Sequence, residues 1–208
     1  MFFIMTQTNS TYDIKSVLTI LHKELLKGAG FKKNKALFTR DKDSVTQIIE
    51  FQIENSLDKF TINLGMYVKG YHELYTNGLR PPATITPAHC PLNIRIAKLI
   101  GSKLDVWWDL HDIEENTFNE INVLFVKKII PFFEQYYSLN DVIKLLVNNE
   151  KFTFNEHLRQ IAIAYLFHMI GDKSNALTHF CLARNEIDVQ HAKTFFDDRL
   201  TQLGYKVK

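Results

Sequence analysis

The chain has 208 residues, of which 46% are hydrophobic and 23% charged, and it is long enough to bury a substantial core. Its formal net charge of +2 creates no global field that would draw it to nucleic acid or to an anionic membrane. No apolar run approaches the roughly 20 residues of a membrane span, and the apolar start, Met1–Met5, is too short for a signal peptide. Two cysteines, Cys90 and Cys181, exclude a disulfide framework, so we expect a cytoplasmic protein.

The first predicted element is a helix over about residues 11–27. Ser10 followed by Asp13 resembles a capping box, and Gly28 supplies the backbone freedom of a helix C-terminus. Between them, apolar residues recur at spacings of three and four and form one stripe: Ile14, Val17, Leu18, Leu21 and Leu25.

Three antiparallel strands are predicted next, near residues 35–41, 45–54 and 59–69. In the third, apolar residues alternate strictly from Phe60 to Val68, a pattern typical of a strand with one covered face. Polar tetrapeptides at 41–44 and 55–58 close the two hairpins. Fourth and fifth strands are predicted at Ile94–Ile100 and Val106–Leu110, after a long loop, Gly70–Asn93, that holds four of the five prolines.

Beyond Asp112 the pattern is helical. Capping boxes are predicted where Thr117 precedes Glu120, Ser138 precedes Asp141 and Thr153 precedes Glu156, and two more helices are expected near 173–184 and 188–203. Pro131 is expected to kink or end the first of these helices. The sequence therefore predicts an α+β fold. An N-terminal helix on a small antiparallel sheet of three to five strands, residues 1–112, precedes an all-helical region, residues 113–208, and both pack as one unit.

The last 55 residues resemble a single tetratricopeptide helical hairpin, in which small residues let two helices approach and aromatic residues fill the gap. Gln160 and Asp188 depart from that pattern, and such arrays normally need about three repeats. The alternative is a helical bundle with similar spacing. The residues that carry the resemblance are Ala164, Phe167, Gly171, Ala176, Phe180 and Ala183.

The front of the chain resembles a bacterial family of small proteins that is known only as a domain of unknown function. The resemblance covers about residues 11–135 and implies an α+β fold and a bacterial cytoplasmic setting, but no activity. Its motifs are Gly30-Phe31-Lys32-Lys33, Phe51-Gln52, Asn63-Leu64-Gly65, Cys90, Arg95 and Trp107-Trp108-Asp109-Leu110.

The tryptophan pair is the leading functional candidate. Adjacent residues of a strand point to opposite faces, so one of Trp107 and Trp108 is expected in the core and the other outside. The outer indole lies beside Asp109 in an acidic segment that has no lysine or arginine between Leu104 and Val126. It is therefore expected to suit a basic or amphipathic protein partner. The alternative is that both indoles only cover the sheet.

A second candidate site uses the polar face of the sheet and the long loop. Gln52, Asn63 and Tyr67 are expected on that face together with Thr61, and Arg95 beside them has the geometry to bind a carboxylate or phosphate. His89 and Cys90 suggest a nucleophile or ligand site under the loop, although adjacent residues usually diverge. The alternative is an ordinary solvated face.

Metal and nucleic-acid sites are disfavoured. The sequence has neither CxxC nor HExxH, so no metal or cofactor is expected. The basic residues Lys32, Lys33, Lys35 and Arg40 fit a solvated edge strand better than a phosphate-binding surface, because only two aromatic residues interleave with them.

The leading prediction is a non-enzymatic bacterial binding module, immunity-like or stress-related, that recognises another protein. Its surface combines the 70–93 loop, the tryptophan pair and the acidic segment. The first alternative is a small-ligand or enzymatic site formed by His89, Cys90 and Arg95, and the second is nucleic-acid binding.

Overall fold

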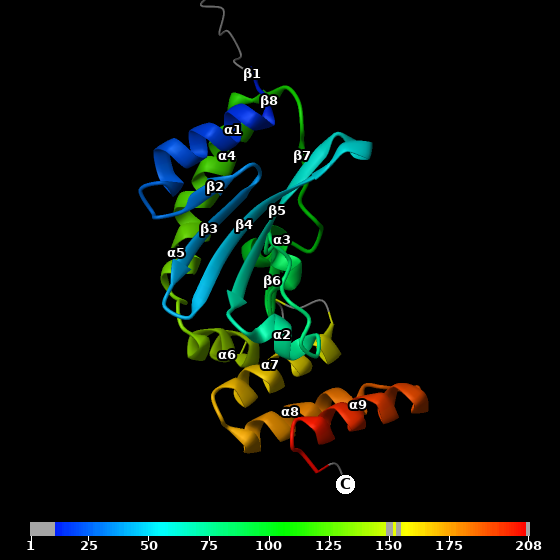
Figure 1. The fold of residues 1–208 in the computed structure, drawn as a ribbon. Helices are drawn as coiled ribbons and strands as arrows, with labels where there is room; N and C mark the ends of the chain where they lie inside the picture. The colour runs from blue at the N-terminus through cyan, green and yellow to red at the C-terminus, as the bar shows by residue number, and fades with distance from the viewer. Residues whose placement is uncertain (1–10, 149–151, 153–154, 207–208) are drawn as a thin grey trace, which may run out of the picture. The chain divides into compact units, whose positions relative to one another are not determined.

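A computed structural model of the chain describes residues 11–148, 152 and 155–206 (Figure 1). Its contacts divide the chain into two compact units. The first unit comprises Met1–Arg40, Ile49–Asn63 and Arg95–Tyr136, and the second comprises Asp41–Ile48, Leu64–Ile94 and Tyr137–Lys208. Both units are therefore assembled from segments that are distant in the sequence. The predicted boundary near Asp112 stays a prediction.

The main sheet has the strand order β2-β3-β4-β5-β6, with β7 paired to β5. A separate ribbon pairs β1 (Thr11–Tyr12) with β8 (Ile113–Glu114). The α+β fold and the three predicted hairpin strands are confirmed. The strands of the main sheet are β2 (Lys32–Asn34), β3 (Leu37–Lys42), β4 (Val45–Glu54), β5 (Lys59–Val68), β6 (Leu92–Arg95) and β7 (Trp108–Asp109).

Both predicted hairpin turns contain an aspartate with left-handed backbone. Asp43 has φ of 46° and Asp58 has φ of 49°. Aspartate tolerates this conformation better than most residues, because its short polar side chain can hydrogen-bond locally. The polar tetrapeptides thus supply the residues that these tight connections require.

The helices of the first unit differ from prediction at their ends. Helix α1 (Ile14–Leu21) begins after Asp13, whose carboxylate accepts a 2.6 Å hydrogen bond from the Ser16 N–H. That bond lowers the pKa of Asp13. Ser10, the predicted partner in this cap, lies outside the described residues. A π-helical turn, His22–Leu26, continues α1.

The predicted capping box at Thr117 is wrong, because α4 (Glu115–Leu124) already begins two residues earlier. The expected break at Pro131 takes the form of a π-helical turn, Phe125–Ile129, followed by α5 (Ile130–Glu134). The Ile130 N–H donates to the Phe125 carbonyl, five residues back. A wider turn at this place accommodates a proline, which has no N–H to donate and crowds the preceding turn.

Phenylalanine rings form the core of the first unit. The Phe51 ring on β4 lies with its centroid 5.9 Å from that of Phe38, 5.7 Å from that of Phe60 and 5.9 Å from that of Phe125. All four side chains are at most 2% exposed. The helix that carries Phe125 therefore covers the apolar face that the alternation in β4 and β5 predicted.

Two expectations about the main sheet are wrong, one about the segment after the long loop and one about the polar face of β5. The segment Ile94–Ile100 does not form one strand, since β6 ends at Arg95 and α3 (Ile96–Ile100) follows, ending at Gly101 with φ of 76°. The polar face of β5 is not solvated either. Thr61, Asn63 and Tyr67 are all buried, so this strand is covered on both faces.

Among the described residues, the second unit contains α2 (Tyr71–Tyr75) and the α-helices that follow Tyr137. These are α6 (Leu139–Asn148), α7 (Glu156–Met169), α8 (Lys173–Asn185) and α9 (Gln190–Gln202). The capping box at α6 is confirmed, because the Ser138 N–H donates to Asp141 Oδ2 at 3.1 Å and the Asp141 N–H donates to Ser138 Oγ at 3.2 Å. Thr153 lies outside the described residues, and the observed N-cap of α7 is Asn155.

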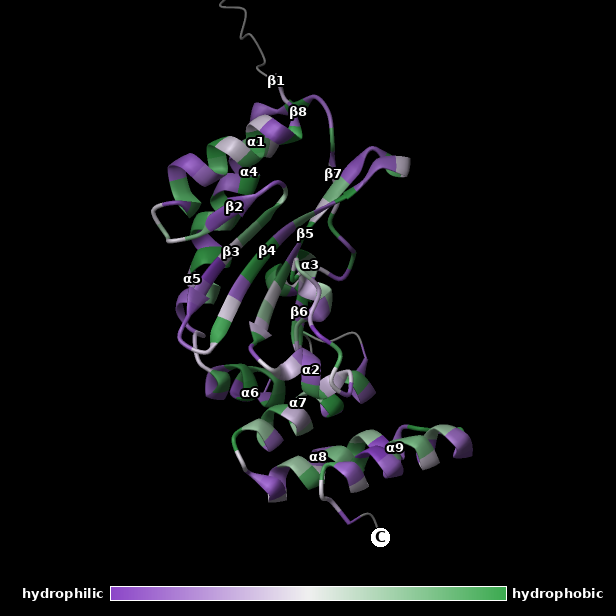
Figure 2. Cartoon of the chain, viewed as in Figure 1, coloured by the Kyte–Doolittle hydropathy of each residue, from purple (hydrophilic) through white to green (hydrophobic). Residues whose placement is uncertain are grey.

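Helices α7 and α8 form the predicted helical hairpin around Gly171, whose φ is 79°. Ala164, Ala176, Phe180 and Ala183 are fully buried at the contact. Kinship with the tetratricopeptide repeat stays a prediction. Helix α9 carries hydrophilic residues interspersed with hydrophobic ones (Figure 2). None of the helices in the described ranges is long and apolar enough to cross a membrane.

Candidate functional site

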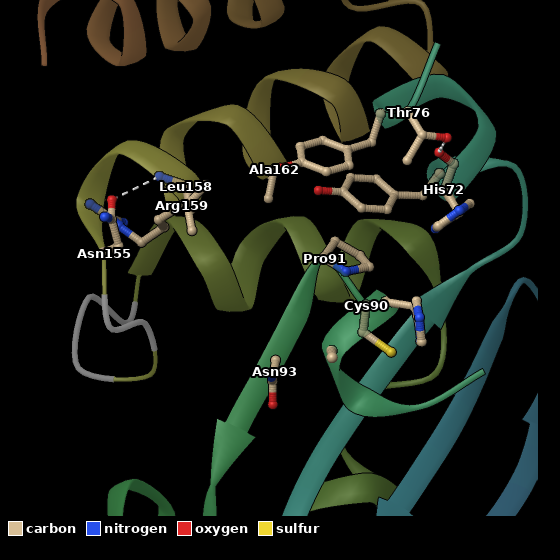
Figure 3. Close-up of a pocket in the computed structure, with 13 residues that line it drawn as sticks. His72, Thr76, Cys90, Pro91, Asn93, Asn155, Leu158, Arg159 and Ala162 are labelled. Atoms are coloured by element: carbon tan, nitrogen blue, oxygen red, sulfur yellow. Dashed lines mark hydrogen bonds between the residues drawn. The ribbon is translucent and has the colours of Figure 1, made fainter. Parts of the chain in front are cut away.

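A cavity of about 270 Å³ lies in the second unit, between α2, the segment before β6, and the N-terminal part of α7 (Figure 3). We call it the α2–α7 cavity. Tyr71, His72 and Tyr75 come from α2, His89 and Cys90 from the end of the predicted loop, and Asn155, Leu158, Arg159 and Ala162 from α7. The cavity thus brings together residues that lie up to 91 positions apart, from Tyr71 to Ala162 (162 − 71 = 91).

A capping box fixes the His89 side of the cavity. The Thr86 N–H donates to His89 Nδ1 at 3.1 Å, across the short 3₁₀ turn Pro87–His89. Because Nδ1 accepts this bond, the proton of the neutral imidazole sits on Nε2. His89 therefore offers an N–H donor at Nε2, and its ring lies edge-on to His72 at a centroid distance of 5.8 Å.

Gly65 on β5 lets the same turn approach the sheet. A Cβ at this position would lie 2.8 Å from Pro87 Cα and 2.9 Å from Cys90 Sγ. Glycine is the one residue that fits there without a shift of the backbone. The Asn63-Leu64-Gly65 motif of the sequence thus has a physical role, which is to seat the wall that carries His89 and Cys90.

Stacked tyrosines form the α2 side. The rings of Tyr71 and Tyr75, one helical turn apart, lie 5.8 Å apart at an interplanar angle of 8°. Tyr165 on α7 meets both edge-on, at 6.4 and 6.0 Å. Burial raises the pKa of Tyr71, and the neighbouring Tyr75 and Tyr165 raise it further, so its hydroxyl stays protonated.

The α7 side is held by an internal ion pair. Arg159 donates from Nε and Nη2 to the Glu156 carboxylate at 2.8 and 2.5 Å, and from Nη1 to the Leu146 carbonyl at 2.8 Å. The hydrogen bond from Arg159 lowers the pKa of Glu156. The Arg159 charge is thereby matched within α7, and this side chain serves as a fixed part of the wall.

The predicted residues of the sheet form a separate group in the first unit, which we call the Arg95 cluster: Gln52, Asn63, Arg95, Asp105 and Trp107. Arg95 Nη1 donates to Asp105 Oδ2 at 2.7 Å, and Arg95 Nη2 donates to Gln52 Oε1 at 3.3 Å. The Asn63 amide donates to the same Gln52 oxygen at 2.8 Å. Arg95 is thus engaged with neighbouring side chains and does not line the α2–α7 cavity.

The tryptophan pair divides as the alternation predicted. Trp108 is 8% exposed and stacks on Phe60 with centroids 5.6 Å apart. Trp107 donates from Nε1 to Asp105 at 3.0 Å, and the Arg95 guanidinium lies 5.3 Å from its ring centre. A partner-binding role for Trp107, Trp108 and Asp109 stays a prediction, and Trp107 and Asp109 are the members that reach the surface.

Other predicted site residues are part of the fold. Tyr67 is buried, which raises the pKa of its hydroxyl, and it does not line the cavity. Arg40 is 4% exposed and donates to Glu134 at 2.6 Å, so it is not available for phosphate. Within the described ranges, no group of three or more His, Cys, Asp or Glu side chains is placed to hold a metal ion.

Sequence reasoning found His89 and Cys90 but missed most of the cavity. Tyr71, His72 and Tyr75 lie in a segment that was predicted as loop, although the i, i+4 spacing of the two tyrosines is a weak sign of a helix. Arg159 lies among the polar residues Glu156, His157 and Gln160 near the start of α7, so no sequence pattern marks its role in the wall.

Residues 22–135 match DUF4304, a domain of unknown function. The match spans more than half of the 208 residues. The chain belongs to the DUF4304 family. No curated protein and no solved structure matches the chain. The Arg95 cluster and the α2 and His89 sides of the cavity lie inside the DUF4304 range, whereas the α7 side lies beyond it.

Proposed function

We propose that the chain is a binding module whose second unit holds a small molecule in the α2–α7 cavity. The observation that carries this proposal is a preformed hollow in which an apolar surface meets polar groups with no partner. Within the described residues, the buried Tyr71 hydroxyl, the exposed Tyr75 hydroxyl and the exposed Asn93 side-chain amide make no hydrogen bond to another protein group. Small-molecule sites combine these features, namely an apolar lining and a few polar groups that orient the ligand.

The test is to fill the cavity and ask whether ligands are lost. Ala162, 3% exposed, lines the cavity from α7, and Ala162→Leu would occupy part of its volume. The matched control is Ala192→Leu on α9, which adds the same side chain away from the cavity. We expect a mixture of small fragments to show saturation transfer with the wild type and the control but not with Ala162→Leu. Equal signals from all three proteins, or none from the wild type, would contradict the proposal.

A second candidate is recognition of another protein through Trp107 and Asp109. The observation that favours it is a partly exposed indole held rigid by Asp105 and Arg95, since fixed aromatic side chains often dominate interfaces. In affinity capture with a bacterial lysate, Trp107→Ala should lose a specific partner that Leu104→Ala keeps. Leu104 is 79% exposed in the same segment and serves as the control. Retention of every partner by Trp107→Ala would remove this candidate.

A further inference from the structure

We propose that the ligand of the α2–α7 cavity is a small monocarboxylate with a compact apolar body. This inference rests on the proposed function, because it names the chemical class that the same cavity would hold. It follows from three properties of the wall: its hydrogen-bond donors, its lack of carboxylates and its apolar side.

The donors come from two sides of the cavity. His89 offers its Nε2 proton, because Nδ1 is occupied by the Thr86 N–H at 3.1 Å. Tyr71 and Tyr75 each carry a hydroxyl that donates to no group in the described part of the chain. Burial raises the pKa of Tyr71, which keeps its proton available. A carboxylate accepts several hydrogen bonds at once, so it suits a wall that presents more than one donor.

The described wall offers no carboxylate to a cation. Among the described residues that line the cavity there is no aspartate or glutamate. Glu156, one position from the lining residue Asn155, is committed to Arg159 through hydrogen bonds of 2.8 and 2.5 Å. An ammonium ligand would lose its hydration without gaining a carboxylate, whereas an anion meets donors. The expected preference for an anionic ligand therefore comes from oriented neutral donors rather than from a net positive charge of the wall.

The rest of the wall sets the shape of the ligand. Pro91, Leu158, Ala162 and Ala88 supply apolar surface, and the stacked tyrosine rings add a flat aromatic side. A volume of about 270 Å³ is at the small end of ligand sites. A single compact ring or short branched chain with one carboxylate matches that space.

A series of three small aromatic probes tests the charge preference. Benzoate and benzamide have nearly the same planar shape and carry charges of −1 and 0 at neutral pH, and benzylamine has the same ring on a smaller substituent with a charge of +1. We expect benzoate to bind at least about tenfold more tightly than benzamide, the ratio that one charge-assisted hydrogen bond supplies, and benzylamine to bind weakest. Equal affinity for benzoate and benzamide, or tighter binding of benzylamine, would overturn the carboxylate class.

Two substitutions at His89 separate the donor from the fold. Glutamine and glutamate both complete a capping box at this position, so His89→Gln and His89→Glu should preserve the bond to the Thr86 N–H. Glutamine also offers an N–H donor to the cavity, whereas glutamate places a negative charge there. Benzoate affinity should stay within about threefold in His89→Gln and fall by at least about tenfold in His89→Glu. The melting temperatures of both variants establish that they are folded.

The outcomes distinguish this inference from the proposed function. Benzoate binding that is unchanged by His89→Glu overturns the assigned role of His89 and the carboxylate class. If neutral probes bind as well as benzoate and Ala162→Leu abolishes both, the cavity is a ligand site and only the ligand class is wrong. If fragments ignore Ala162→Leu altogether, the proposed function itself fails.

Discussion

The Arg95 cluster and the α2–α7 cavity both contain polar side chains, but they differ in how many of these have hydrogen-bond partners within the protein. In the cluster, arginine, amide, carboxylate and indole groups are joined to one another by bonds of 2.7 to 3.3 Å. In the cavity, two tyrosine hydroxyls and the side chain of one asparagine have no hydrogen-bond partner in the described part of the chain. Polar groups that satisfy each other hold a structure together, whereas polar groups left open around a hollow are available to a ligand.

This difference also bears on Arg95, which the sequence suggested as a residue that binds a carboxylate or phosphate. Arg95 has the right chemistry for a carboxylate, but it already binds one from its own unit, that of Asp105. A ligand would have to displace Asp105 from Arg95, and the free energy of that intramolecular bond would be lost. The cavity carries no such cost at Tyr71, because its hydroxyl has no intramolecular partner in the described structure that a ligand would have to displace.

The largest expected effect comes from adding a methyl group at Gly65, against which the turn that carries His89 packs. Gly65→Ala would force a methyl group to 2.8 Å from Pro87 Cα, so the turn that carries His89 must shift. Overpacking of this kind costs about 1–3 kcal/mol in the free energy of unfolding, measured by urea denaturation. Gly28→Ala is the control, since its nearest neighbour, the Leu25 carbonyl oxygen, would be 3.6 Å away. Equal stability of the two variants would show that the turn is not seated as described.

Arg95→Ala should destabilise the chain by about 1–2 kcal/mol, because it leaves Gln52 and Asp105 without their charged donor. Benzoate binding should not change, because Arg95 does not line the cavity. Urea denaturation and calorimetric titration provide the two measurements, with the exposed Arg80→Ala as control. Loss of benzoate binding in Arg95→Ala would contradict the separation of the two sites.

Tyr71→Phe should show the opposite pattern. The hydroxyl makes no hydrogen bond in the described structure, so its removal should change the free energy of unfolding by less than about 0.5 kcal/mol. Benzoate affinity should nevertheless fall, because a donor is lost. A large loss of stability with unchanged binding would mean that the Tyr71 hydroxyl is structural.

The smallest effect concerns acid stability. The pKa of Glu156 is lowered, first by its hydrogen bond from Arg159, so the ionised form stabilises the fold at neutral pH. This stabilisation is present above the ordinary value of 4.5 and is lost as the pH falls through the lowered pKa of the folded state. Glu156→Gln should be less stable than the wild type at pH 7, and the two should converge in acid. A difference that grows in acid would contradict the assigned ion pair.

Much of the fold could be predicted because its patterns are long. The alternation from Phe60 to Val68 identifies β5, and Ser138 with Asp141 marks the start of α6. The short run Ile94–Ile100 was misjudged, since a few apolar residues fit a strand and a helix equally well. Burial of Thr61 and Asn63 could not be predicted, because tertiary contacts decide what covers the second face of a strand.

The candidate site was predictable only where it is local. His89 and Cys90 were conspicuous in a proline-rich loop, and the cavity includes both. The side formed by Asn155, Leu158 and Ala162 comes from a helix more than 60 residues farther along the chain, and no periodicity within α2 or the loop indicates that approach. The partners of Arg95 were likewise hidden, because Asp105 has no special pattern in the sequence.

The capping box around His89 has a consequence for the thermodynamics of binding. A side chain that must be immobilised by its ligand costs about 0.5–1.5 kcal/mol of rotational entropy. The imidazole of His89 has already lost that freedom to the Thr86 N–H, and Pro87 restricts the turn between them. The donor is therefore oriented before the ligand arrives, and this part of the wall needs no rearrangement on association.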